Sequence, residues 1–183
     1  MPVAMFIFSH VDVLDAESGT LIKDRHVRVE GERIAEVSER PLSAPGARVI
    51  DARGKVLMPG LIDCHVHCLA SQLNLGRLAH MPNVLSVLRA VPILKGMLDR
   101  GFTTVRDAGG ADFSLAEAVR TGVIAGPRIF PSGRALSQTG GHGDMRERSD
   151  IIEPCGCTPK VGAIARVVDG VDAIRLAVRE EIQ

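Results

Sequence analysis

The sequence predicts an α/β protein that begins with a small β-rich segment. Short runs of β-favouring residues, separated by Gly- and Pro-containing turns, fill residues 5–55. From residue 56 onward strand-like and helix-like segments alternate. The resulting order βαβαβα is typical of a parallel sheet with right-handed crossover connections. We therefore expect a β-domain over 1–57 and successive βα units over 58–183.

The composition indicates an ordinary globular chain. Of its 183 residues, 45% are hydrophobic and 24% are charged. Lys+Arg and Asp+Glu both total 22, so the balanced charge predicts neither a nucleic-acid partner nor a membrane partner. The apolar run at 5–8 is too short for the core of a signal peptide, and no run approaches the ~18 residues of a membrane span. We expect a cytoplasmic protein.

The β-rich segment divides into strands at clear turn signals. Gly31 lies between two β-type runs, in a tight hairpin that needs a positive φ. Further turns are expected at 17–19 and 45–46. The expected strands are Phe6–Val13, His26–Val29 and Arg33–Val37. The segments Val49–Asp51 and Lys55–Met58 lead into the next strand.

The βα units are expected to carry three main helices. Residues 85–100 have apolar side chains at helical spacing, and Gly101 supplies a stop. Pro92 predicts a kink or two shorter helices. The apolar residues concerned are Leu85, Leu88, Val91, Leu94 and Leu98.

The later units follow the same alternation. Strands are expected at 102–105 and 128–130. Between them, Ser114 and Glu117 form a capping box that opens a short helix ending at Gly122. Asp169 can cap a last helix, with its apolar face formed by Val171, Ile174, Val178 and Ile182.

The segment from Val56 to His67 carries the strongest chemical signal. In a strand, Asp63, His65 and His67 share one face, whereas Ile62, Cys64, Val66 and Cys68 share the other, apolar face. Two imidazoles side by side can ligate one divalent metal, for which zinc is the usual choice. A His-x-His pair alone is more often incidental. Pro59-Gly60 before the strand, and Asp63 beside the histidines, favour the metal site.

His142 is the next candidate. It lies in the glycine-rich run Gly140–Asp144, after the third expected strand, where barrel enzymes build their active sites. The alternative is a solvated loop histidine. Arg106 and Asp107 lie at the end of the second strand. They either form part of the rim of an active site or form an ion pair that holds the loop in place.

The remaining histidines and the cysteines give weaker signals. His10, His26 and His80 have no partner at ligand spacing, so we interpret them as structural or solvated. Cys64 and Cys68 are expected to act as small hydrophobes on the apolar strand face. Cys155-Gly156-Cys157 has no second thiol pair at zinc-finger spacing, which favours loop thiols over a metal site.

Two runs carry a family resemblance. Pro59-Gly60-Leu61-Ile62-Asp63-Cys64-His65-Val66-His67 resembles the first-strand signature of the amidohydrolase superfamily, metal-dependent hydrolases built on a (β/α)8 barrel. The run from Gly133 to His142 resembles the imidazolonepropionase-like branch, which includes dipeptidases that cleave Xaa-Pro or Xaa-Arg substrates. The implied fold class is α/β: the first part of a (β/α)8 TIM barrel, preceded by a small β-sandwich-like N-terminal domain.

The resemblance also implies a chemistry. His65 and His67 would be metal ligands for zinc, with one or two divalent metals in the intact enzyme, and His142 would be a catalytic residue that contacts substrate. The implied activity is hydrolysis of C–N bonds in a small molecule such as an Xaa-Pro or Xaa-Arg dipeptide or an N-acyl amino acid. The intact form is expected to be a homo-oligomer.

The length limits what this chain can do alone. A complete barrel needs ~250 residues, and the family's remaining ligands and its general base, on later strands, would follow Gln183. We therefore expect an N-terminal segment that is inactive by itself. The alternative is a non-catalytic chain that binds metal weakly or assembles with another chain.

Overall fold

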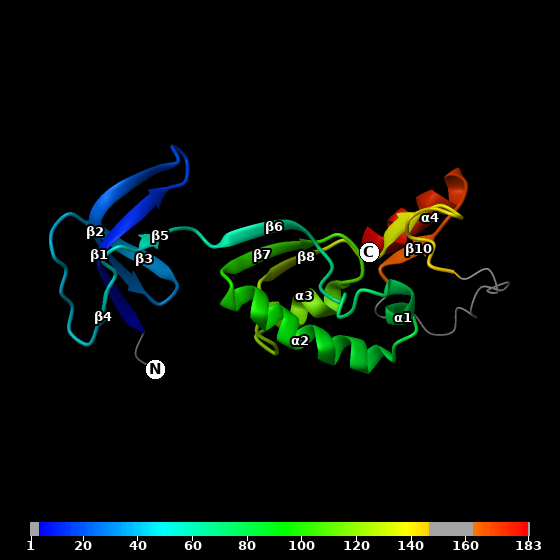
Figure 1. Ribbon diagram of the computed structural model, residues 1–183, viewed down its shortest axis with the longest axis horizontal. Coiled ribbons are helices and arrows are strands. Elements are labelled where there is room, and N and C mark those ends of the chain that lie inside the picture. The colour runs from blue at the N-terminus through cyan, green and yellow to red at the C-terminus, as the bar shows by residue number, and fades with distance from the viewer. Residues whose placement is uncertain (1–3, 147–162, 183) are drawn as a thin grey trace. The chain divides into compact units, whose positions relative to one another are not determined.

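The computed structural model describes residues 4–146 and 163–182, so Cys155 and Cys157 lie outside the described residues. The chain divides into two compact units, Met1–Pro59 and Gly60–Gln183 (Figure 1). Across the described part of the chain, no helix is long and apolar enough to cross a membrane.

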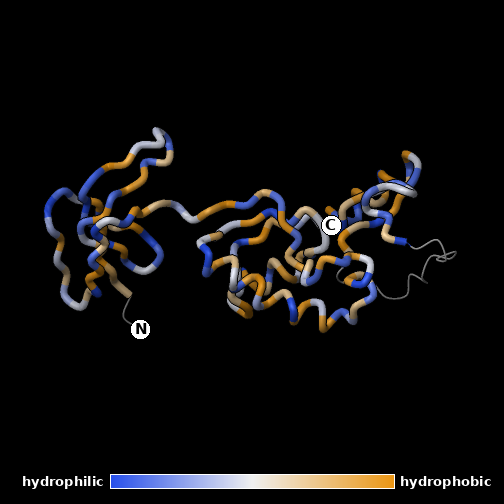
Figure 2. Tube along the Cα trace, viewed as in Figure 1, coloured by the Kyte–Doolittle hydropathy of each residue, from blue (hydrophilic) through white to orange (hydrophobic). Residues whose placement is uncertain are grey.

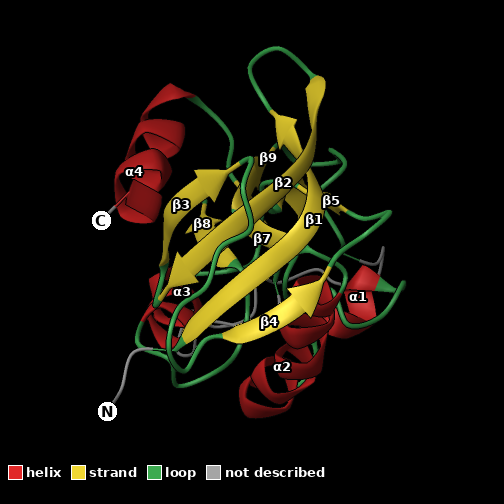
Figure 3. Ribbon diagram, turned by 90° about the vertical axis from the view of Figure 1, so that its left-hand side faces the viewer, coloured by secondary structure: helices red, strands yellow, loops and turns green. Residues whose placement is uncertain are grey.

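The first unit is one mixed β-sheet. Its strands are β1 (Met5–Asp15), β2 (Thr20–Glu30), β3 (Arg33–Ser38), β4 (Arg48–Asp51) and β5 (Val56–Leu57). β1, β2 and β3 pair in antiparallel fashion, whereas β4 and β5 both pair with β1 in parallel. Figure 3 shows β3, β2, β1 and β4 side by side in that order.

The expected hairpin is confirmed. Gly31 has φ 59°, and Glu30 pairs with Arg33 across the turn. A small core lies on one face of this sheet, where Val11 and Val27 are almost fully buried. The partly buried residues Phe8, Val13, Val29 and Leu57 pack against it.

The β1–β2 pair contains two irregularities. Its register shifts between Phe8 and Val11, and again between Val11 and Val13. Each shift holds a residue in the left-handed region, His10 at φ 56° and Asp24 at φ 50°. In residues 4–146 and 163–182 these are the two non-glycine residues with positive φ. Such β-bulges bend a strand and re-aim its side chains.

The second unit is built on the predicted parallel strands. β6 (Leu61–Val66), β7 (Phe102–Asp107) and β8 (Arg128–Pro131) form a three-stranded parallel sheet in the order β6-β7-β8. α1 (Leu75–Ala79) and α2 (Asn83–Asp99) connect β6 to β7, and α3 (Phe113–Arg120) connects β7 to β8. α2 packs against β7 and α3 against β8 (Figure 1).

α2 differs from its prediction in two respects. It is one continuous helix that contains Pro92, so two shorter helices are ruled out and the alternative, a kink at Pro92, stays a prediction. Its buried side is formed by Ser86, Ala90 and Leu94, whereas Leu88 is 61% exposed. Small side chains allow the helix to approach the sheet closely. Hydrophobic residues recur along the whole helix (Figure 2), and for this reason the apolar pattern alone did not identify the buried side.

The core of the second unit joins α2, α3, the sheet and the segment that follows β6. Ala90 and Leu94 come from α2 and Val105 from β7. The other buried members are Cys68, Leu69, Ala111, Leu115 and Ile129. This core fixes the C-terminal ends of β6 and β7 relative to each other.

The cap of α3 also differs from its prediction. Asp112 is the N-cap, and its side chain accepts a hydrogen bond from the Leu115 N–H. The Ser114–Glu117 capping box is therefore wrong, and Glu117 instead pairs with Arg120. The helix ends before Gly122, which has φ 74°, as expected.

A second, smaller sheet was not predicted. β9 (Ala135–Ser137) and β10 (Ala165–Val167) form a parallel pair, and α4 (Val171–Ile182) follows. The Asp169 carboxylate accepts hydrogen bonds from the Thr139 N–H and hydroxyl, so it ties β9 to the entry of α4. On α4 only Ala177 is buried, and all four residues of the expected apolar face are exposed.

Candidate active site

The histidine pair lies at the C-terminal end of β6. His65 is within the strand, and His67 follows it directly. Their ring centroids are 5.4 Å apart and the ring planes are nearly perpendicular, at 88°. The structure therefore brings together the two imidazoles that the alternation of β6 predicts on one face.

A backbone carbonyl orients His67. The Nδ1 atom of His67 lies 3.0 Å from the carbonyl oxygen of Gly109, in the loop after β7. A carbonyl can only accept a hydrogen bond, so Nδ1 carries the proton and Nε2 keeps its lone pair. This is the arrangement in which proteins hold a metal-ligating histidine.

Asp107 connects the ends of the two strands. It is the last residue of β7 and is fully buried, with 0% of its surface exposed. Its Oδ2 accepts the backbone N–H of Cys68 at 2.6 Å, and its Oδ1 accepts those of Gly109 and Ala111 at 2.9 and 3.1 Å. One carboxylate thus fixes both the segment that carries His67 and the loop that supplies its carbonyl partner.

Gly109 is required by a close backbone approach. A Cβ atom at this position would lie 2.6 Å from the carbonyl oxygen of Ile164, just before β10. Real Cβ atoms essentially never come so close to a backbone oxygen, so only glycine leaves the loop where His67 can reach it.

The two described cysteines differ in environment. Cys68 is buried against Asp107, and burial together with the nearby carboxylate raises the pKa of its thiol far above the usual range. It is therefore an unreactive part of the core. Cys64 is exposed on β6, as are Leu61 and Ile62. β6 is an edge strand among the described residues.

Arg106 and Asp107 do not form the ion pair considered as an alternative. Successive residues of a strand point to opposite faces, and here Asp107 points inward. The Arg106 side chain is exposed, and its Nε donates to the carbonyl oxygen of Cys64 at 2.6 Å. Both residues tie β7 to the β6 segment, by separate contacts.

His142 lies exposed on a hydrogen-bonded turn after β9. The Asp144 carboxylate accepts the Gly140 N–H, and the Ser137 hydroxyl accepts the Gly143 N–H. Arg146 also binds Asp144 and holds the pKa of that carboxyl well below its usual range. That His142 lines the same cavity as His65 and His67 stays a prediction.

A cavity of about 390 Å³ lies beside α1. His80 is one of its lining residues, and its Nδ1 binds the carbonyl oxygen of Gly76. Neither the histidine pair nor His142 lines this cavity. Its other lining residues are Asn74, Gly76, Arg77 and Met145.

Two other histidines, interpreted from the sequence as structural or solvated, have neighbours that the sequence did not indicate. His10 and His26, in the first unit, have ring centroids 4.7 Å apart, and His10 also binds Asp24. They are distant in sequence, and only the register of the β1–β2 hairpin brings them together.

Comparison with known proteins places these features in a family. The model of the amidohydrolase family matches residues 56–183. Ochratoxinase from Aspergillus niger is 34% identical over 147 residues, which cover 72% of this chain and 29% of that protein. Imidazolonepropionase from Anaeromyxobacter sp. (strain K) is 34% identical over 87 residues, or 43% of this chain and 21% of that protein.

A solved structure extends the likeness over the whole fold. A prolidase in complex with N-methylphosphonate-L-proline is 61% identical, with a TM-score of 0.88 over 98% of this chain and 44% of its own. The chain thus spans less than half of the proteins it matches. Its fold is that of the first part of an amidohydrolase barrel with its small β-domain, as predicted. The chain belongs to the amidohydrolase family.

Proposed function

We propose that this chain supplies part of the active site of a metal-dependent hydrolase acting on C–N bonds, with His65 and His67 as metal ligands. The observation that carries the proposal is the contact between His67 and Gly109. It fixes the tautomer of His67 so that Nε2 is available next to the His65 ring.

The donor set suits zinc but does not complete its coordination. Two imidazole nitrogens are ligands that zinc favours, and a catalytic zinc typically has three protein ligands and a water molecule. His65 and His67 would supply two of these ligands, and later strands of the barrel would supply the rest. A zinc ion held by these residues would supply an activated water for hydrolysis at neutral pH.

The proposed substrate is a dipeptide with a C-terminal proline. The 61% identical prolidase, whose structure contains a proline phosphonate, supports this choice. Xaa-Arg dipeptides and N-acyl amino acids are the alternatives within the same chemistry. His142 would contact the substrate, because loops after barrel strands form the active site in this architecture.

The experiment is a chimera in which residues 1–183 replace the matching part of the prolidase. The comparison covers 98% of this chain at 61% identity, so the junction should fold without new contacts. We expect the chimera to hydrolyse Xaa-Pro dipeptides. In the chimera His67→Ala should abolish turnover and lower zinc content, because it removes a ligand.

A matched control is His80→Ala, which removes an exposed histidine of the α1 cavity. Zinc content and turnover should remain those of the chimera. Full activity in the His67→Ala chimera would contradict the ligand assignment. An active chimera that prefers N-acyl amino acids or Xaa-Arg dipeptides would support the proposed mechanism but contradict the proposed Xaa-Pro substrate.

A second candidate has support from the exposed apolar residues of the second unit. Ile62 on β6 is 66% exposed, and Leu88 on α2 is 61% exposed. Where such side chains form a contiguous patch, they can mark a contact surface for another protein chain. We propose as the alternative that this chain is a non-catalytic part that assembles with another chain.

A further inference from the structure

We propose that the first unit contains a second metal site, in which His10, His26 and Asp24 bind a divalent cation such as Zn²⁺ apart from the histidine pair of β6. One ring nitrogen of each histidine and one carboxylate oxygen all lie within 4.8 Å of one another. Among the described residues, these three form the one group of at least three potential metal ligands whose ligand atoms lie this close together.

The distances are close to those of a bound ion. His10 Nδ1 and Asp24 Oδ1 are 2.9 Å apart, and the His10 and His26 ring centroids are 4.7 Å apart. Ligands at about 2.1 Å from a tetrahedral zinc ion lie about 3.4 Å from one another. Small side-chain rotations suffice, and the cation would replace the proton shared by His10 and Asp24.

The backbone is shaped to bring these side chains together. His10 lies in a bulge on β1, and Asp24 lies in a bulge on β2. Both residues adopt the left-handed conformation, which costs an ordinary residue about 1–2 kcal/mol. Two opposed bulges aim His10 and Asp24 at each other beside His26, and a shared ligand would compensate for this strain.

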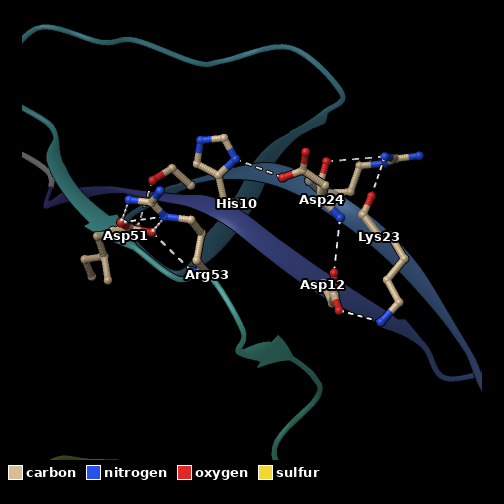
Figure 4. Close-up of polar contacts among 9 residues, drawn as sticks. His10, Asp12, Lys23, Asp24, Asp51 and Arg53 are labelled. Atoms are coloured by element: carbon tan, nitrogen blue, oxygen red, sulfur yellow. Dashed lines mark hydrogen bonds and ion pairs between the residues drawn. The ribbon is translucent and has the colours of Figure 1, made fainter.

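The neighbouring charges leave the Asp24 carboxylate available. The Asp12 carboxylate forms an ion pair with Lys23, with 2.7 Å between Oδ2 and Nζ, and the Asp51 carboxylate forms an ion pair with Arg53 (Figure 4). Arg53 holds the pKa of the Asp51 carboxyl at about 2. Within the described residues, His10 is the side chain that binds the Asp24 carboxylate, and Figure 4 shows the two pointing toward each other.

One of the three ligands is buried and the other two are exposed, as expected of a metal site at a protein surface. His26 is 4% exposed and provides a fixed ligand within the sheet. The side chains of His10 and Asp24 are 45% and 71% exposed, so a cation can enter from solvent and keep a water molecule. Nitrogen and carboxylate donors together suit Zn²⁺ better than Ca²⁺ or Mg²⁺.

The experiment isolates this site from the one on β6. The 183-residue chain with His65→Ala and His67→Ala is equilibrated with Zn²⁺, and bound zinc is measured by dialysis and elemental analysis. We expect one zinc per chain. Adding His10→Asn or Asp24→Asn should weaken the affinity at least about tenfold. Asparagine tolerates the left-handed conformation, so both variants should keep the bulges.

A control and a spectroscopic readout separate binding from a structural role. His80→Asn should leave zinc binding unchanged. In the double variant, the X-ray absorption spectrum of the bound zinc should show histidine nitrogen and carboxylate oxygen ligands whether or not the chain self-associates, and EDTA should remove the zinc. The proposal is overturned if the double variant retains no zinc, or if Asp24→Asn and His10→Asn bind it as tightly as their parent.

Discussion

His67 and Gly109 belong to different βα units, yet the His67 Nδ1 atom lies 3.0 Å from the Gly109 carbonyl oxygen. This contact requires the loop after β7 to pass next to Ile164, where no side chain fits at residue 109. The orientation of the proposed metal ligand therefore depends on the absence of a Cβ atom 42 residues away in sequence.

Gly109→Ala should displace this loop and release His67. Its added Cβ would lie 2.6 Å from the Ile164 carbonyl oxygen, so the backbone must shift. In the prolidase chimera we expect zinc affinity or turnover to fall about 10–100-fold, as for the loss of other partners of metal-binding histidines. Elemental analysis and dipeptide assays would measure both.

Gly76→Ala is the matched control for this variant. Its Cβ would come no closer than 3.4 Å to a neighbouring atom, and the position is helical. We expect both zinc affinity and turnover to stay unchanged. Normal zinc affinity and turnover in Gly109→Ala would show that the carbonyl contact does not position His67.

Asp107→Ala should destabilise the second unit strongly. The substitution leaves three buried backbone N–H groups, those of Cys68, Gly109 and Ala111, without their acceptor. Because an unsatisfied buried donor is costly, we expect a loss of about 3–5 kcal/mol in the free energy of unfolding. Urea denaturation of the chimera would measure it.

Asp99→Ala is the control that shows how much stability is lost when a surface carboxylate is removed. Asp99 pairs with Lys95 on the exposed side of α2, and such pairs contribute less than about 0.5 kcal/mol. A similar small loss for Asp107→Ala would contradict its role as the link between the two strand ends.

The sequence predicted the parallel strands and the histidine pair because both depend on local patterns. Alternation along β6 puts His65 and His67 together, and β-branched residues mark β7. The Asp107 contacts were not predictable, since they depend on where the loop after β7 meets the segment after β6. Likewise, the His10 and Asp24 side chains are in contact only because each residue lies in a bulge, and no local sequence pattern predicted these bulges.

The helix faces were predicted less well, for a different reason. α2 carries apolar residues around most of its circumference, and the side that packs contains Ser86 and Ala90 rather than Leu85 and Leu88. Close packing against the sheet favours small side chains there. The larger apolar residues remain on the side that the described chain leaves exposed.

His142→Asn should lower turnover in the chimera and leave zinc content near that of the parent. The histidine is exposed on a turn that other residues hold in place, so its loss should not disturb the fold. We expect turnover to fall at least about tenfold, as for loss of a group that positions substrate. Loss of zinc would instead make His142 a ligand, and unchanged turnover would remove it from the active site.

Arg146→Gln should raise the pKa of Asp144. The hydrogen bonds from Arg146 are the largest cause of its lowered pKa, ahead of the Gly140 N–H. A lowered pKa means that the charged carboxylate stabilises the turn at neutral pH, and that this support is lost as the pH falls through the folded-state pKa. Carboxyl ¹³C NMR titration would measure the change.

Asp15 serves as the internal reference in the same titration. Its pKa is lowered by the Ser18 hydroxyl and by backbone N–H groups, with no contribution from Arg146. The Asp15 pKa should therefore be the same in both proteins. If the Asp144 pKa also stayed the same, the ion pair with Arg146 would not form in solution.

The 183-residue chain alone should self-associate and lack hydrolase activity. β6 and β8 are the edges of its three-stranded parallel sheet in the described residues, and open edges pair readily with other chains. Exposed apolar side chains on β6, α2 and α4 add to this tendency, among them Ile62, Leu88 and Ile182. Two histidines also leave a zinc ion with fewer protein ligands than a catalytic site needs.

Sedimentation velocity, zinc analysis and a dipeptide assay on the isolated chain test this expectation together. We expect oligomers or aggregates, weak exchangeable zinc at the β6 site and no turnover. Co-expression with the remaining part of the prolidase should reduce self-association and restore activity, because the later strands of the prolidase would cover β6 and β8. A monomeric chain with tightly bound zinc at His65 and His67 and prolidase-like turnover would show that these 183 residues complete the active site unaided.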